Sequence, residues 1–415
     1  MNKNLAKLAL PLFVFWPFGS FICALQNIKL KSSAIVIILF SMVYGYSFSF
    51  NDYSADSYRT AFVFSLFDFS SFDTIWALYK EGSYTDIYKF LLFGIVKLFS
   101  NNPKMLYALC GLIFGIFMYA SMHLFSKQKS TQNDIYITLL AIFFFSLNPI
   151  SHINGFRFWT ASWIFFYALI KFFVYNEKKW FIGILISSLI HFSFLFIIPN
   201  VILFIILKKL IYSSKQVHKG ILLIFIVTFI FSWILDTNVI SLDLLKEQDL
   251  LSSSVNRKID LYNSDTATEK MMQRSASLFI RVDKIFAGIL KIYIFIIIYY
   301  MYKIINKTKD YNLIKLLALV MVFISFGFIA TVIPSGGRFL TIAYLVALFL
   351  LLKIYVKFRS SQLQTLIKWG IPIFSFKIFF GIIYLSYSLV SSTLWFGNLF
   401  WILYEGIGFE VDYYL

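Results

Sequence analysis

Long apolar runs recur along the whole chain and are separated by short polar segments. A helix that crosses a membrane needs about 20 mostly apolar residues. The pattern therefore predicts an all-α, polytopic integral membrane protein with about 12 transmembrane helices. We expect the spans at residues 8–26, 33–50, 103–126, 134–150, 157–175, 180–197, 198–212, 219–235, 285–302, 312–333, 338–355 and 368–390.

Two stretches depart from a simple succession of spans. Residues 180–212 are interrupted only by Pro199-Asn200, which is compatible with one long helix or with a re-entrant pair. Residues 88–100 contain Lys89 and Lys97 and resemble an interfacial or re-entrant segment. We expect one integral membrane domain over residues 1–415, with outer amphipathic or re-entrant helices at 51–102 and a large outer loop at 236–284.

Composition and charge agree with this class. The chain is 60% hydrophobic and 14% charged, with a mean hydropathy of +0.79. A net charge of +17 is compatible with a nucleic-acid partner, but the charge follows the expected spans, so no nucleic acid is expected. One set of alternate loops holds 18 basic and three acidic residues, and the opposite set holds 14 and 17. The basic set is expected to be cytoplasmic. Both termini and the unusual segments 51–102 and 236–284 then face outward.

Arg157 and His191 are ionisable residues in an otherwise apolar region, and such residues are functional candidates by default. Arg157 begins one expected span at the outer face. His191 lies in the next span, about 9 Å below its outer end. The turn between the two spans is short, so the helices are expected to pack as antiparallel neighbours with both side chains in one cavity. The alternatives are a snorkelling arginine and a buried neutral histidine.

Further candidates lie on the same expected face. Arg338 follows "PSGG" at the start of another span, where glycines permit a close approach of ligand to backbone. Arginine suits phosphate oxygens because its planar fork donates two hydrogen bonds at once. The candidates for substrate binding are Asp52, Asp56, Tyr58, Arg59, Asn154, Arg274 and Arg281, of which the two aspartates are also possible general bases.

The chain lacks the sequence motifs that are typical of several other kinds of chemistry. The chain contains no Walker motif, no His/Cys metal cluster and no G-x-S-x-G elbow, so neither a metal nor a cofactor is expected. Cys23 and Cys110 both lie in expected spans and indicate no disulfide framework.

Several segments together resemble the EpsG and Wzy type of polysaccharide polymerases. They are "NDYSADSYRTAF", "NNPKMLYALCGLIFGIFMYAS", "NGFRFWTASWIFFYALIKFF" followed by a lysine-rich turn, "ISSLIHFSFLFIIP" and "PSGGRFLTIAYLVALFLL". Weaker similarity covers most of residues 30–355. The first outer loop departs from the family, with "YGYSFSFNDY" in place of its Arg-Tyr and Gly-x-Asp context.

The resemblance implies a metal-independent glycosyltransferase of the bacterial inner (plasma) membrane, with its active site facing the periplasm or exterior. It would polymerise undecaprenyl-diphosphate-linked repeat units into O-antigen, which is the polysaccharide part of lipopolysaccharide, or into the capsule at the cell surface. Its partners would be the lipid-linked donor and acceptor, membrane lipids, a chain-length regulator and a flippase. Arg157 and Arg338 would hold the diphosphate. His191 would act as base or orient the attacking hydroxyl.

Three other functions stay open at this point. One is another lipid-linked-sugar enzyme, such as an O-antigen ligase, or a glucosyltransferase in which Asp52 or Asp56 would be indispensable. The second is a membrane O-acyltransferase, although that class usually needs a histidine open to the cytoplasm. The third is a non-enzymatic flippase, which would need a cationic cavity that opens to both sides.

Overall fold

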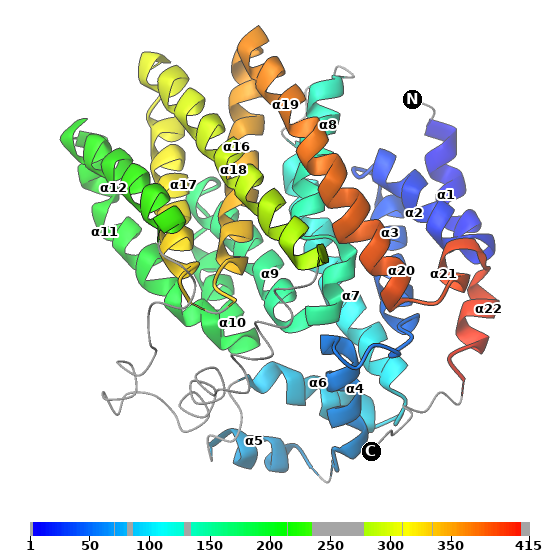
Figure 1. Ribbon diagram of the computed structural model, residues 1–415. Helices are drawn as coiled ribbons and strands as arrows, with labels where there is room; N and C mark the ends of the chain where they lie inside the picture. Colours follow the sequence, from blue (N-terminus) through cyan, green and yellow to red (C-terminus); the bar gives the residue numbers. More distant parts are fainter. Residues whose placement is uncertain are drawn as a thin grey trace.

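Helices make up the whole architecture of the described residues, with no strand and one isolated β-bridge between Phe48 and Val390. The computed structural model (Figure 1) describes residues 3–69, 71–80, 86–127, 134–213, 215–234, 278–308, 310–333 and 335–407. Within these ranges the expected all-α membrane class is confirmed. Seven helical segments are long and apolar enough to cross a membrane.

The N-terminal half contains short helices as well as long ones. Its elements are α1 (Lys3–Phe15), α2 (Pro17–Gln26), α3 (Lys31–Tyr46), α4 (Asp56–Leu66), α5 (Phe72–Lys80), α6 (Ile87–Lys97), α7 (Pro103–Lys127), α8 (Ile135–Leu147), η1 (Ile150–Gly155), α9 (Phe156–Phe173), η2 (Lys178–Trp180), α10 (Phe181–Ile190) and η3 (Phe192–Phe196).

The second half is dominated by long helices and ends in short ones. Its elements are α11 (Ile198–Ser213), α12 (Lys215–Ile234), α16 (Leu278–Thr308), α17 (Tyr311–Ala330), α18 (Arg338–Phe358), α19 (Ser361–Ile378), the π-helix η4 (Phe379–Tyr384), α20 (Leu385–Leu389), α21 (Thr393–Phe396) and α22 (Leu399–Tyr404).

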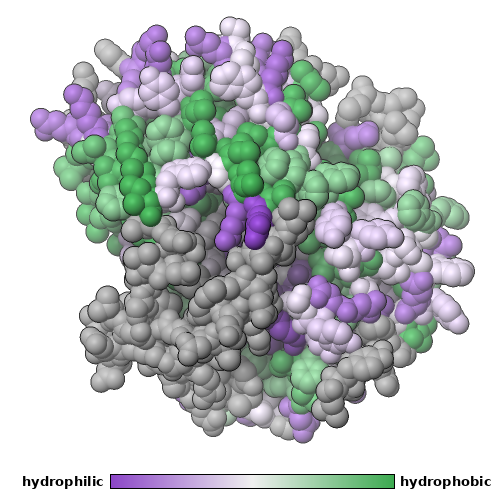
Figure 2. All heavy atoms as spheres, viewed as in Figure 1, coloured by the Kyte–Doolittle hydropathy of each residue, from purple (hydrophilic) through white to green (hydrophobic). Residues whose placement is uncertain are grey.

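The two ends of the bundle differ in character. Figure 1 places the turns α7/α8, α11/α12, α16/α17 and α18/α19 together at the top, and the short helices α4, α5 and α6 together at the bottom. Lys127, Lys307 and Lys357 lie in the last turns of helices that end at the top. Figure 2 shows hydrophilic residues gathered there above a hydrophobic band. We call the end with these turns the lysine-rich end, and the end with α4, α5 and α6 the site end.

Glycines allow α3 and α7 to pack in close contact. A Cβ atom added to Gly111 would lie 2.1 Å from the carbonyl oxygen of Ser41, and one added to Gly45 would lie 2.0 Å from that of Tyr107. Small residues let membrane helices approach until their backbones touch. This packing fixes where α3 ends, and therefore where the chain enters α4 at the site end.

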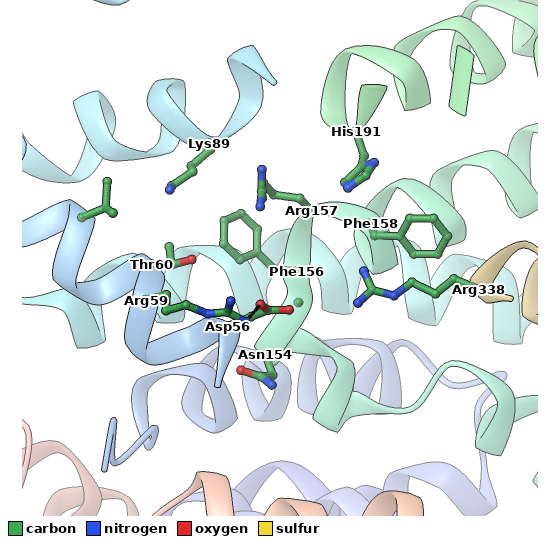
Figure 3. Close-up of a pocket in the computed structure, with 12 residues that line it drawn as sticks. Asp56, Arg59, Thr60, Lys89, Asn154, Phe156, Arg157, Phe158, His191 and Arg338 are labelled. Atoms are coloured by element: carbon green, nitrogen blue, oxygen red, sulfur yellow. Dashed lines mark hydrogen bonds and ion pairs between the residues drawn. The ribbon is translucent and has the colours of Figure 1, made fainter. Parts of the chain in front are cut away.

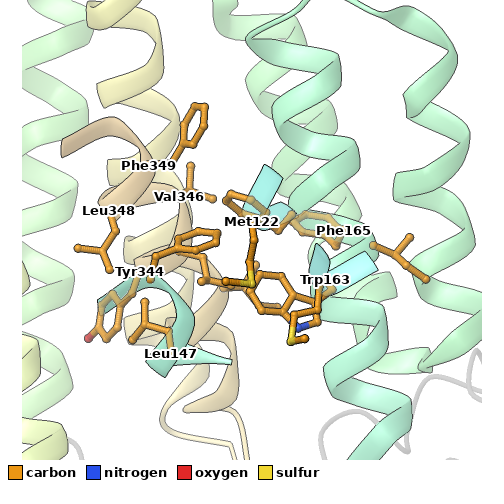
Figure 4. Close-up of a cluster of buried hydrophobic side chains, with 14 of the residues drawn as sticks. Met122, Leu147, Trp163, Phe165, Tyr344, Val346, Leu348 and Phe349 are labelled. Carbon is orange, nitrogen blue, oxygen red and sulfur yellow. The ribbon is translucent and has the colours of Figure 1, made fainter. Parts of the chain in front are cut away.

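A dense aromatic and aliphatic core joins α7, α8, α9 and α18 (Figure 4). Trp163, Phe165 and Phe166 of α9 have no exposed surface, and Phe349 of α18 is also fully buried. Phe144 of α8 contacts both Trp163 and Phe166, with ring centroids 5.7 Å and 5.1 Å apart. These ring contacts join α8 to α9 within the core. The short η1 turn between them holds the first turn of α9 at the site end.

Two expected spans are wrong in detail. Residues 8–26 do not form one helix, because the chain breaks at Trp16-Pro17 and α2 packs back against α1. Proline lacks an amide hydrogen and favours the first turn of a new helix. In residues 180–212 the helix is broken at His191, directly after α10 ends at Ile190, and not at Pro199-Asn200. Pro199 lies in the first turn of α11, where a proline removes no helical hydrogen bond.

The two unusual segments differ in how much of each the structure describes. The region 51–102 contains α4, α5 and α6, each of nine to 11 residues. The expected loop 236–284 lies outside the described residues up to residue 277. Residues 278–284 belong to α16, which continues without interruption into the expected span at 285–302.

Candidate functional site

A cavity of about 230 Å³ lies where α4, α6, α9, α18 and the end of α10 meet (Figure 3). Its walls are formed by Asp56, Arg59, Thr60, Val63, Lys89, Asn154, Gly155, Phe156, Arg157, Phe158, His191 and Arg338. Six of the candidates from the sequence are thus brought together from four separate segments of the chain. They are Asp56, Arg59, Asn154, Arg157, His191 and Arg338.

Arg157 lies in the first turn of α9 and is held by a buried carboxylate. Its Nη1 donates to Oδ2 of Asp86 over 2.6 Å. The Asp86 side chain is 1% exposed, whereas that of Arg157 is 35% exposed. The other N–H groups of Arg157 have no hydrogen-bond partner among the described residues. They are therefore available to an anion in the cavity.

His191 occupies the break between α10 and η3, where its backbone is extended at φ −145° and ψ 117°. The amide of Ser193 donates to Nδ1 over 3.3 Å, and Oγ of Ser193 lies 2.7 Å from the same atom. Because Nδ1 accepts a hydrogen bond, the neutral ring carries its proton on Nε2. The ring also packs edge-on against Phe158, with centroids 5.3 Å apart.

Arg338 begins α18 directly after a tight turn. Ser335 adopts a φ of 64°, and the amide of Gly336 donates to the carbonyl of Ile333 over 2.9 Å. The guanidinium carbon of Arg338 lies 5.7 Å from the centroid of the Phe158 ring, within cation–π range. Among the described residues it has no hydrogen-bond or ion-pair partner. Figure 3 shows Arg338 and Arg157 reaching the cavity from different helices.

The opposite wall is formed by α4 and η1. Asp56 forms an ion pair with Arg59, with Oδ1 and Nη2 2.6 Å apart. The other oxygen, Oδ2, would lie 3.5 Å from a Cβ added to Gly155. Asn154 accepts the amide hydrogen of Ser57 over 2.8 Å and so joins η1 to the first turn of α4. Its role in the structure is to position α4.

The remaining sequence candidates do not line the cavity. Asp52 is exposed and accepts hydrogen bonds from the amide and hydroxyl of Ser54. Tyr58 packs on Tyr53, with ring centroids 4.7 Å apart. Arg281 is an exposed residue of α16. Arg274 lies outside the described residues.

Sequence reasoning missed Lys89 and Asp86. The sequence pattern predicts an interfacial segment around Lys89, yet Lys89 lines the cavity, and its Nζ lies 5.2 Å from the centroid of the Phe93 ring. Nothing in the local pattern marks Asp86 as the partner of Arg157. Both are charged residues of one apolar segment, since Asp86 directly precedes α6 and Lys89 lies in its first turn. Their distance in sequence from Arg157 concealed the connection.

The cavity suits an anion. Four cationic side chains line it, namely Arg59, Lys89, Arg157 and Arg338, against the single lining carboxylate of Asp56. With the buried Asp86 included, four positive charges face two negative ones. Positive side chains in a site partly shielded from water interact strongly with phosphate groups. In the described part of the chain, no group of three or more His, Cys, Asp or Glu residues is arranged to hold a metal ion.

Comparison with known protein families now adds to this geometry. Residues 31–405 match the model of the EpsG family, which is far more than half of the chain. The chain belongs to the EpsG family. No curated protein and no solved structure matches it.

Membership of the EpsG family agrees with the resemblance found in the sequence. It supports a role in polysaccharide polymerisation as a membrane glycosyltransferase. The match spans every segment that lines the cavity, from Asp56 in α4 to Arg338 in α18.

Proposed function

We propose that this EpsG family member polymerises undecaprenyl-diphosphate-linked repeat units into a surface polysaccharide, without a metal, at the outer face of the bacterial inner membrane. The observation that carries the proposal is the cationic cavity that joins Arg157, Arg338, Lys89 and His191. A growing glycan on its lipid diphosphate would be the donor. A single repeat unit on the same type of carrier would be the acceptor.

The reaction needs positive charge where the leaving group forms. A hydroxyl of the acceptor sugar attacks the anomeric carbon of the donor, and a new carbon–oxygen bond forms. The bond between that carbon and the phosphate oxygen breaks, and undecaprenyl diphosphate leaves with the electron pair. Donors placed in advance around developing charge stabilise such a transition state. Arg157 and Arg338 would supply them, each with hydrogen-bond capacity that no described residue uses.

The proton of the attacking hydroxyl needs an acceptor. His191 was one candidate, but its Nδ1 already accepts from Ser193 and its Nε2 carries the ring proton. Nε2 therefore suits the donation of a hydrogen bond to a phosphate or sugar oxygen. We assign the role of base to Asp56, whose Oδ1 is paired with Arg59 and whose Oδ2 lies beside Gly155 at the cavity wall.

The site end would face the exterior. The turns that carry Lys127, Lys307 and Lys357 are basic, and short basic loops remain in the cytoplasm. The site end is opposite to them in Figure 1. Lipid-linked repeat units that have reached the outer leaflet would then enter the cavity directly.

Packing beneath the cavity favours an enzyme over a flippase. Trp163, Phe165 and Phe166 follow Arg157 along α9 towards the lysine-rich end, and none has exposed surface. A flippase needs a path for a polar glycan that opens to each side in turn. Fully buried aromatic side chains along that route support chemistry at one face instead.

The test is restoration of polymer in a deletion strain of the source bacterium. Arg157→Ala, His191→Ala and Arg338→Ala should each reduce long polymer, with roughly 100-fold to 1000-fold loss for an arginine that contacts the developing charge. Arg281→Ala is the matched control, because Arg281 is an exposed arginine that does not line the cavity. Membrane levels of each variant are measured on the same cells.

The pattern of products separates the functions. Loss of a polymerase leaves a single repeat unit attached to its acceptor, whereas loss of a ligase or flippase leaves the acceptor bare. Wild-type polymer from all three cavity variants would show that this cavity is not the active site. A bare acceptor in the deletion strain would contradict polymerisation itself.

A further inference from the structure

Asp86 is the sole buried carboxylate among the residues that the structure describes. A charged group away from water is costly unless it is fully hydrogen-bonded and paired. Asp86 meets that condition, because Oδ2 accepts from Nη1 of Arg157 over 2.6 Å and Oδ1 accepts from the amide of Phe192 over 2.9 Å. Both oxygens are occupied and the side chain does not line the cavity. Asp86 is therefore not placed to touch substrate.

The two partners of Asp86 belong to different parts of the site. Arg157 is 71 residues away in sequence, and Phe192 is 106 residues away. The second contact matters because α10 ends at Ile190 and Phe192 is the first residue of η3, so the amide of Phe192 has no acceptor within a helix. Asp86 supplies that acceptor. One carboxylate thus holds Arg157 and stabilises the chain break that directs the His191 ring into the cavity.

We propose that Asp86 is a positioning residue that fixes Arg157 and His191 relative to each other. The guanidinium of Arg157, which would hold the diphosphate, and the imidazole of His191 then act on the same substrate. This proposal rests on the proposed function. It predicts that Asp86 contributes to turnover rather than to affinity. Removing its charge leaves the cavity more positive, so an anionic lipid should bind at least as well while the arginine loses its fixed position.

The first variant is Asp86→Asn in the full-length protein in lipid nanodiscs. An amide oxygen can accept from only one of the two donors, and its NH2 group faces the other. We expect kcat to fall about 100-fold, since misplacement by about 1 Å has that effect on catalytic groups. KM should be unchanged or lower. Binding of undecaprenyl diphosphate should be retained by Asp86→Asn and weakened by Arg157→Ala.

A second pair of variants isolates the contact with Phe192. Phe192→Pro removes the amide hydrogen, and the extended backbone of His191 is compatible with a following proline. Phe192→Ala removes the same ring, which stacks near His191, but keeps the amide hydrogen. Turnover of Phe192→Pro should be about tenfold below that of Phe192→Ala, the effect of losing one hydrogen bond to a charged group. In an Asp86→Asn background this difference should largely disappear.

Hydrogen exchange gives a readout that does not depend on catalysis. The segment around Phe192 should exchange faster in Asp86→Asn than in the wild type, while the core of α9 stays protected. Equal turnover of Phe192→Pro and Phe192→Ala with unchanged exchange in Asp86→Asn would overturn the proposal. So would a loss of undecaprenyl diphosphate binding by Asp86→Asn. An inactive wild-type protein would instead contradict the proposed function, and the binding and exchange results would still decide the role of Asp86.

Discussion

Gly336 offers the sharpest test that the turn before α18 positions Arg338. A Cβ atom at this residue would lie 1.8 Å from the carbonyl oxygen of Ala330 and 3.0 Å from that of Ile333. Both obstacles are backbone atoms, so no side-chain rotation can relieve the contact. Gly336→Ala therefore forces the turn itself to move, and Arg338 lies only two residues further along.

The size of the movement follows from the contact. The distance to the oxygen of Ala330 must lengthen from 1.8 Å to at least 3.0 Å, a shift of at least 1.2 Å. A displacement of about 1 Å at a catalytic group costs on the order of 100-fold in rate. We expect Gly336→Ala to lower kcat about 100-fold. Strain of this kind also destabilises a protein by about 1–3 kcal/mol.

Gly337→Ala is the control for this experiment. No heavy atom lies within 4 Å of a Cβ added at Gly337, and its φ of −55° suits any residue. Both variants are assayed in nanodiscs with a lipid-linked repeat unit, and their melting temperatures are compared in the same preparation. Gly337→Ala should match the wild type in activity and in melting temperature.

Two results would contradict a positioning role for this turn. Wild-type turnover in Gly336→Ala would show that the turn does not determine the position of Arg338. An equal loss in Gly337→Ala would show that the segment is sensitive to any side chain, not to the contact with Ala330.

Three further predictions concern the base, the orientation and the lysine-rich end. Asp56→Asn should reduce turnover by roughly 100-fold or more, as expected for a general base. Asp52 lies away from the cavity, so Asp52→Asn should retain wild-type turnover. Equal losses in the two variants would contradict the role of Asp56 as the base. A membrane-impermeant thiol reagent applied to intact cells should label a cysteine at Asp52 and spare one at Lys178, in a background that lacks Cys23 and Cys110; the reverse pattern would invert the membrane orientation. Finally, a hydrogen bond from Lys357 lowers the pKa of Asp310, which also caps the first turn of α17. Its contribution to stability is therefore present above the unfolded-state pKa of about 3.9 and is lost as pH falls through the lower folded-state value. The melting temperature should fall on acidification below that region, and Asp310→Asn should flatten the fall; an unchanged pH profile would contradict this role.

Much of the fold followed from local sequence. The spans at 103–126, 312–333 and 338–355 correspond to α7, α17 and α18 within a few residues. In each case the apolar run is long enough to cross the membrane, and a helix satisfies all of its backbone hydrogen bonds there. The errors fall where the chain is apolar but not continuously helical. Trp16-Pro17 and His191 both interrupt apolar runs, and hydropathy does not distinguish a straight helix from a broken one.

The candidate site was predictable in part. Arg157, His191 and Arg338 could be named because a charged or polar group in an apolar run is unusual by itself. Asp56 and Asp52 looked alike in sequence, and only the packing of η1 against α4 places Asp56 at the cavity wall. Lys89 was visible as a charge but not as a member of the site.

The linear pattern of residues is thus sufficient for the membrane class, the family and the residues whose charge needs an explanation. Which of those charges meet depends on the packing of the helices. Burial and helix formation depend on neighbours a few residues away, so they can be inferred from a linear pattern. The contact of Asp86 with Arg157 and Phe192 joins segments 71 and 106 residues apart. Such a contact depends on how the helices pack, and no local pattern in this chain encodes it.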